Sequence, residues 1–134
     1  MAVHHVLFVC THNAGRSQMA AGFLTQLGGD SLVVASAGTA PAEALNPAVV
    51  AAMLEMGVDL RENEPTLLTR EALDEAQLVI TLGVDSADLP GTHHLHWDFP
   101  DPAGSRLESV RPIRDAIRQR VLEFLAELNA PVAA

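Results

Sequence analysis

Residues 5–17 read HVLFVCTHNAGRS, and this stretch begins an alternation that the rest of the chain continues. Its first half, His5–Cys10, is a short apolar run rich in residues that favour β-structure, which is typical of a strand buried on both faces. A polar loop follows, and Ser17 then predicts the N-cap of a helix that Gly28-Gly29 ends. The stretch therefore predicts a strand, a loop and a helix in direct succession.

The remaining segments repeat this order. Further strands are expected at residues 31–37, 78–82 and, at the periphery, 94–97. Further helices are expected from Asn46-Pro47 to Gly57, over Thr69–Ala76, and over a long amphipathic segment that includes Val110 to Leu128. Strands that alternate with helices predict a mostly parallel sheet covered on both faces. The fold class is therefore α/β, and ligands are expected at the carboxyl ends of the strands, where Cys10 lies.

The composition limits the classes of protein to which the chain can belong. Its 134 residues, 49% of them apolar, suit a single domain over residues 1–134 with one hydrophobic core. It has 17 acidic residues against 8 basic ones, and the formal net charge of −9 argues against nonspecific binding to nucleic acid. No apolar run approaches the roughly 18 residues of a membrane span, and the N-terminus lacks the pattern of a signal peptide. We therefore expect a cytoplasmic protein with neither nucleic acid nor membrane as partner.

The spacing between Cys10 and Arg16 indicates an oxyanion-binding loop. Five residues between a strand end and a helix start can curl their backbone N–H groups toward one centre, and the helix N-terminus adds its own unsatisfied donors. Arg16 offers a planar fork for tetrahedral oxygens, Gly15 allows tight curvature, and Asn13 tolerates left-handed backbone. The predicted binding residues are Thr11, His12, Asn13, Ala14, Gly15, Arg16 and Ser17.

The same positive field acts on Cys10. It favours the thiolate, which is the nucleophilic form of cysteine. The Ser17 hydroxyl can cap the helix or donate to this thiolate, and the sequence does not separate the two roles. The alternative is a cysteine packed at a strand end as an inert core residue, with Arg16 nearby by chance. The apolar strand before the loop and the helix after it favour the catalytic interpretation.

The stretch VLFVCTHNAGRSQMA, residues 6–20, resembles the nucleophile loop of the low-molecular-weight protein tyrosine phosphatase superfamily, and in particular its arsenate reductase branch. The resemblance continues through residues 36–39, 79–82 and 97–103, and so spans nearly the whole chain. It implies a four-stranded parallel sheet flanked by helices, in agreement with the pattern above.

The resemblance also implies roles for individual residues. Cys10 corresponds to the nucleophile and Arg16 to the clamp on the oxyanion. Asn13 and Ser36 resemble the pair that braces the loop. Asp101, in an Asp-Pro pair, corresponds to the general acid that protonates a leaving oxygen.

A second aspartate competes for the role of the acid. Asp98 lies three residues before Asp101 in the same loop, and both side chains are common turn formers. Asp101 is favoured because Pro102 follows it, as in the family pattern, and rigidifies the loop. The choice between the two aspartates stays open at the level of sequence.

The residues around the loop bear on the reaction. The chain has no tyrosine, and Ala103 stands where the tyrosine phosphatases carry one to hold an aryl ring. The resemblance therefore implies reduction of arsenate to arsenite, an activity of arsenical resistance, with phosphate as an analogue of the substrate. Two alternatives stay open: a low-molecular-weight phosphatase, in which water hydrolyses a cysteine-phosphate intermediate, and a non-catalytic oxyanion-binding module.

Reduction of arsenate requires two electrons, which thiols supply. The thioredoxin-coupled members carry two further cysteines, where this chain has Gly83-Val84 and Leu89-Pro90. Cys10 is the sole cysteine, so an internal disulfide cannot form. We expect no bound cofactor, but an external thiol: mycothiol, bacillithiol, or a redox protein of the thioredoxin or glutaredoxin type.

Other polar clusters are expected to be structural. His94 and His96 share a strand face, and with His93 they supply too few converging ligands for a metal, so no metal site is expected. Five arginines of the last predicted helix are expected on a solvated face, where Asp115 and Glu108 pair with them. These arginines are Arg106, Arg111, Arg114, Arg118 and Arg120.

Overall fold

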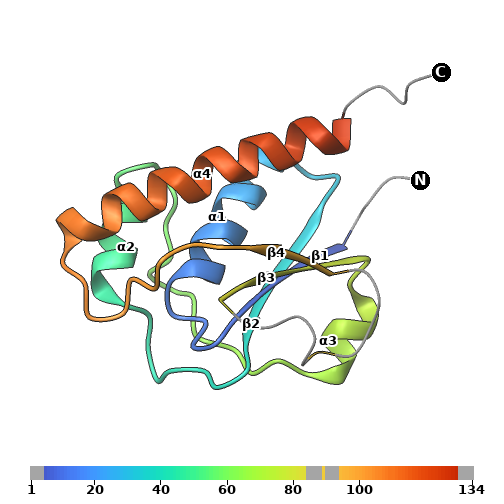
Figure 1. Ribbon diagram of the computed structural model, residues 1–134, viewed down its shortest axis with the longest axis horizontal. Coiled ribbons are helices and arrows are strands. Elements are labelled where there is room, and N and C mark those ends of the chain that lie inside the picture. The colour runs from blue at the N-terminus through green and yellow to red at the C-terminus, as the bar shows by residue number, and fades with distance from the viewer. Residues whose placement is uncertain (1–4, 84–88, 90–93, 130–134) are drawn as a thin grey trace.

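The computed structural model describes residues 5–83, 89 and 94–129 (Figure 1), so Val84, Pro90 and His93 lie outside the described residues. The elements are β1 (His5–Cys10), α1 (Arg16–Gly28), β2 (Val33–Gly38), α2 (Pro47–Leu54), α3 (Arg70–Glu75), β3 (Leu78–Leu82), β4 (His94–Trp97) and α4 (Leu107–Asn129). The predicted alternation and the α/β class are confirmed. The second strand begins and ends slightly later than the run at residues 31–37 predicts.

The four strands form one parallel sheet in the order β2-β1-β3-β4. The chain leaves β1 for β2 on one side and then crosses to β3 on the other. The carboxyl end of β1 is therefore a topological switch point, where open α/β sheets bind ligands. Cys10 is the last residue of β1 and pairs in register with Gly38.

Helices cover both faces of the sheet. Figure 1 shows α1, α2 and α4 on one face and α3 on the other. Phe8 and Cys10 of β1 pack in the larger core beneath α1, α2 and α4, whereas Leu7 and Val9 pack on the face that α3 covers. Because alternate residues of β1 enter different cores, the five residues from Val6 to Cys10 are all apolar and buried, as the sequence predicts.

The start of α1 differs from the prediction. The helix begins at Arg16, and its N-cap is Gly15, which provides no side-chain cap. The prediction that Ser17 caps the helix is therefore wrong. Ser17 is fully buried, and its hydroxyl forms hydrogen bonds across the loop instead of along the helix. By contrast, the side chain of Asn46 caps α2 as predicted, and the side chain of Thr69 caps α3, at the start of the helix predicted over Thr69–Ala76.

The arginines of α4 do not all lie on a solvated face. Arg114 is buried, and its Nη1 donates to the carbonyl oxygen of Ala52 at 2.9 Å and to Glu55 Oε1 at 2.6 Å. Its Nε donates to Asp115 at 2.8 Å, which is a predicted pair. Arg111 donates to both oxygens of the same Glu55 carboxylate, at 3.0 and 2.6 Å. Glu55 and Arg114 thus join the end of α2 to α4.

Glu55→Gln is expected to destabilise the protein at neutral pH and to lose this effect in acid. Hydrogen bonds from Arg111 and then Arg114 lower the pKa of Glu55 from 4.5 to about 2. Because this pKa is lower in the folded state than in the unfolded state, the stabilisation is complete above about pH 4.5 and disappears as the pH falls toward 2. Urea unfolding at several pH values from neutral down to about pH 2 measures the difference in the free energy of unfolding between Glu55→Gln and the parent protein. Glu123→Gln, which removes a charge elsewhere on α4, is the control, and a pH-independent difference contradicts the prediction.

Candidate active site

The loop between β1 and α1 curls around the sulfur of Cys10. This side chain is only 3% exposed. Asn13 has a left-handed backbone, with φ of 50°, and donates its N–H to Cys10 Sγ at 3.2 Å. Ser17 Oγ lies 2.8 Å from the same sulfur. Two polar groups therefore converge on Cys10 and can stabilise negative charge there.

The side chain of Asn13 holds this arrangement in place. Its Nδ2 donates to Ser17 Oγ at 2.7 Å, and its Oδ1 accepts from the Thr66 N–H at 2.8 Å and from Gln18 Nε2 at 3.1 Å. Because the Ser17 oxygen already accepts from Asn13, the Ser17 proton is available to the sulfur of Cys10. The network thus orients a hydroxyl donor toward the cysteine.

This brace differs from the one that the resemblance implies. Ser36 lies on β2 opposite Phe8, and within the described residues its hydroxyl has no hydrogen bond that joins it to Asn13. Gln18 and Thr66 take that place, and neither residue was predicted from the sequence. The signal for Gln18 was a glutamine in the first turn of a largely apolar helix. Thr66 gave no signal, since it is 53 residues from Asn13 in the chain.

The carbonyl groups of the loop are bound by the segment that follows β2. The carbonyl oxygen of His12 accepts from the Ala42 N–H, and that of Ala14 accepts from the Asn46 N–H, both at 3.0 Å. When the carbonyl groups on one side of a loop are held by hydrogen bonds, the neighbouring N–H groups are directed to the other side. The backbone is therefore arranged to present donors to an anion.

Arg16 is buried at the start of α1, with 9% of its surface exposed. Its Nη1 donates to the carbonyl oxygen of Phe99 at 3.2 Å, and its Nη2 lies 3.6 Å from Asp101 Oδ2. The guanidinium also lies against Gly83, which has φ of 80°, and a Cβ there would collide with it. The Arg16 guanidinium is thus held in position both by the loop after β4, through Phe99 and Asp101, and by Gly83, which follows β3.

Gly83→Ala is expected to weaken oxyanion binding by about tenfold, since the new methyl group must displace the Arg16 guanidinium that makes charged hydrogen bonds. Titration calorimetry with inorganic phosphate measures the effect. Gly29→Ala is the matched control, because Gly29 has φ of 74° but no atom within 4 Å of an added Cβ. It carries the same backbone strain without the clash. Equal affinities of the two variants would contradict this account.

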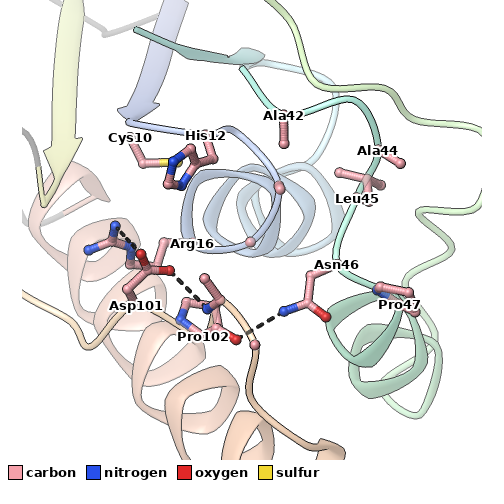
Figure 2. Close-up of a pocket in the computed structure, with 14 residues that line it drawn as sticks. Cys10, His12, Arg16, Ala42, Ala44, Leu45, Asn46, Pro47, Asp101 and Pro102 are labelled. Atoms are coloured by element: carbon pink, nitrogen blue, oxygen red, sulfur yellow. Dashed lines mark hydrogen bonds and ion pairs between the residues drawn. The ribbon is translucent and has the colours of Figure 1, made fainter. Parts of the chain in front are cut away.

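Of the two candidate acids, Asp101 is the one beside the loop. It lines the cavity over Cys10, is 46% exposed in its side chain, and faces Arg16 (Figure 2). Its Oδ1 accepts from the Ala103 N–H at 3.0 Å, which orients the carboxylate. Asp98 is exposed and does not line this cavity.

A cavity of about 490 Å³ lies over Cys10. Figure 2 shows the segment from Ala42 to Pro47 across the cavity from Arg16 and Asp101. Of the predicted binding residues, His12, Ala14, Gly15 and Arg16 line the cavity, and Thr11, Asn13 and Ser17 do not. The cavity therefore joins the predicted nucleophile, clamp and acid in one space.

Residues 5–89 match the family described as low molecular weight phosphotyrosine protein phosphatase. The chain belongs to this family. The match includes the Cys10 loop and ends before the segment that carries Asp101.

Several proteins similar to this chain are named arsenate reductases. One from Bacillus subtilis is 39% identical over 130 residues, which cover 89% of this chain and 93% of the relative. The structure of an arsenate reductase in a phosphate-binding state matches with a TM-score of 0.84 at 31% identity, over 94% of this chain and 99% of that one. A thioredoxin-dependent arsenate reductase from Corynebacterium glutamicum matches with a TM-score of 0.79 at 32% identity. It covers 95% of this chain, which spans 62% of that longer protein.

Two further features concern metals and membranes. Within residues 5–83, 89 and 94–129, no group of three or more His, Cys, Asp or Glu side chains is placed to hold a metal ion. His96 instead pairs its Nδ1 with Thr81 Oγ1 at 2.8 Å. Among the described residues, no helix is both long enough and apolar enough to cross a bilayer.

Proposed function

We propose that the chain reduces arsenate to arsenite through a covalent adduct on Cys10. The observation that carries the proposal is the convergence of the Asn13 N–H and the Ser17 hydroxyl on Cys10 Sγ, at 3.2 and 2.8 Å, beside a buried Arg16. Such a loop suits a thiolate nucleophile and a tetrahedral oxyanion. Identity of 39% to an arsenate reductase supports arsenate as the substrate.

The first step is a displacement at arsenic. The N–H groups of the loop and Arg16 hold the arsenate oxygens, and Cys10 Sγ attacks the arsenic atom. An S–As bond forms while an As–O bond breaks, and Asp101 gives a proton to the departing hydroxyl, which leaves as water. The arsenic remains As(V) at this stage, so no electrons have yet been transferred.

The second step supplies two electrons from two thiols. A thiolate from outside attacks the adduct at arsenic or at the Cys10 sulfur, and a second thiol completes a disulfide. In sum, one arsenate and two thiols give one arsenite, one disulfide and one water. Because Cys10 is the sole cysteine of the sequence, both thiols come from a reductant outside the chain. The candidate reductants are mycothiol, bacillithiol and proteins of the thioredoxin or glutaredoxin type.

A comparison of reductants tests this function. Purified protein is mixed with arsenate and with each reductant in turn, and arsenite is quantified. We expect multiple turnovers with an added thiol and no turnover without it, because the adduct on Cys10 still holds As(V) and one cysteine cannot supply two electrons. Thiol-free production of more than one arsenite per two protein molecules, the most that a disulfide between two copies of Cys10 could supply, contradicts the proposal. Faster turnover of an aryl phosphate than of arsenate would instead favour the phosphatase alternative.

Asp101→Asn is expected to slow formation of the Cys10 adduct by about 100-fold or more, which is the usual contribution of a general acid. The Asn side chain preserves the shape but brings no acidic proton. Asp98→Asn is the matched control and is expected to stay within a few-fold of the parent, because Asp98 does not line the cavity. Rapid quench followed by mass spectrometry measures the adduct. Equal or reversed effects would assign the acid to Asp98.

A further inference from the structure

The cavity over Cys10 is much larger than an oxyanion requires. Its volume of about 490 Å³ lies in the range of pockets that take small organic molecules. The oxyanion needs only the floor, which the Cys10 loop forms. The outer wall, which we define as Ala42, Ala44, Leu45, Pro47, Ala103 and Gly104, faces the part of the cavity that the oxyanion does not fill. We propose that this outer wall is the docking subsite for an uncharged low-molecular-weight thiol, an inference that rests on the proposed arsenate reduction.

The location of Cys10 makes this wall the approach to the adduct. Cys10 is 3% exposed, so arsenic bound to its sulfur is reached through the cavity. Ala44, Pro47 and Ala103 are exposed at the rim. A small thiol that docks against them enters with its sulfur toward the floor. A redox protein would have to insert its cysteine into the same space.

The wall is rigidly attached to the catalytic loops. Ala42 and Asn46 donate their N–H groups to the carbonyl oxygens of His12 and Ala14. The side chain of Asn46 donates to the Pro102 carbonyl oxygen at 3.0 Å (Figure 2). These bonds join the nucleophile loop, the wall and the loop of the acid before any ligand arrives. A subsite built in this way does not have to be ordered when the thiol binds.

The charges around the cavity select an uncharged thiol. Among the described residues that line it, the ionisable side chains are Cys10, His12, Arg16 and Asp101. Arg16 is engaged by Asp101 and by the oxyanion, and the outer wall has no charged side chain. A carboxylate on the thiol would therefore lie near Asp101 and the oxyanion, within a chain of net charge −9. An amide or hydroxyl group meets no such repulsion.

A matched pair of thiols tests the proposal. N-acetylcysteinamide and N-acetylcysteine have the same size, and the second carries a carboxylate where the first has an amide. With saturating arsenate, we expect KM for the amide to be about tenfold lower, the size of one unfavourable charge contact. Equal KM values for the two thiols would overturn the proposal.

Variants at Ala44 locate the effect. Ala44→Lys is expected to reverse the preference by lowering KM for N-acetylcysteine, and Ala44→Phe is expected to raise KM for both thiols. Ala51→Phe, at an exposed site on α2 away from the cavity, is the matched control. The affinity for inorganic phosphate gives a second readout, since the oxyanion lies at the floor. No shift in KM with either Ala44 variant would overturn the subsite.

Two measurements distinguish failure of the thiol subsite from failure of the proposed arsenate reduction. If arsenate forms no adduct on Cys10, the proposed function fails. If the adduct forms but turnover needs a thioredoxin-type protein and neither small thiol supports it, the function stands and the subsite is refuted. Mass spectrometry of the adduct and the arsenite assay together distinguish the two cases.

Discussion

Cys10→Ser is expected to abolish arsenite production, with a loss of at least about 1,000-fold. A serine hydroxyl at this position has no general base among the groups that hydrogen-bond to the Cys10 sulfur, which are the Asn13 N–H and the Ser17 hydroxyl. It therefore stays protonated and cannot attack arsenic. The arsenite assay with the preferred thiol measures the loss, and intact turnover would show that Cys10 is not the nucleophile.

Phosphate binding separates loss of chemistry from loss of the site. The Asn13 N–H and the Ser17 hydroxyl remain in Cys10→Ser, as does Arg16. We therefore expect the affinity for phosphate to stay within a few-fold of the parent. The same calorimetric titration that serves for Gly83→Ala measures it. A large loss of phosphate affinity would mean that the substitution disrupts the loop.

Arg16→Lys is expected to weaken phosphate binding by about 10- to 150-fold, although it preserves the positive charge. A lysine ammonium cannot reproduce the planar fork, and loss of hydrogen bonds to a charged group costs about 1.5–3 kcal/mol. The substitution also removes the bond from Arg16 to the Phe99 carbonyl oxygen. One of the bonds that orient the loop carrying Asp101 is therefore lost with it, and we expect adduct formation to slow further.

Arg70→Lys is the control for this change. Arg70 is exposed on α3 and lies outside the cavity, and its Nε pairs with Asp74 Oδ1 at 3.3 Å. We expect no change in phosphate affinity or in the rate of adduct formation. If Arg16→Lys also binds phosphate like the parent, charge alone holds the oxyanion and the fork is not required.

Local patterns predicted the elements of the fold well. The run at His5–Cys10 identified β1, the cap Asn46 identified the start of α2, and the pattern over Thr69–Ala76 identified α3. These signals act between residues a few positions apart, so they survive in almost any tertiary context. Ser17 was the exception, because its hydroxyl is used by the curled loop and not by the helix.

The candidate active site depends both on local sequence patterns and on contacts that only the tertiary structure makes. The sequence by itself determined the α/β alternation, the position of Cys10 at a strand end and its spacing to Arg16, because strand, loop and helix follow one another directly. Only the tertiary structure brought Thr66 to Asn13, Gly83 to the Arg16 guanidinium, and Asp101 rather than Asp98 into the cavity. Those contacts join residues tens of positions apart. They depend on the order and register of the parallel strands, which no local pattern specifies.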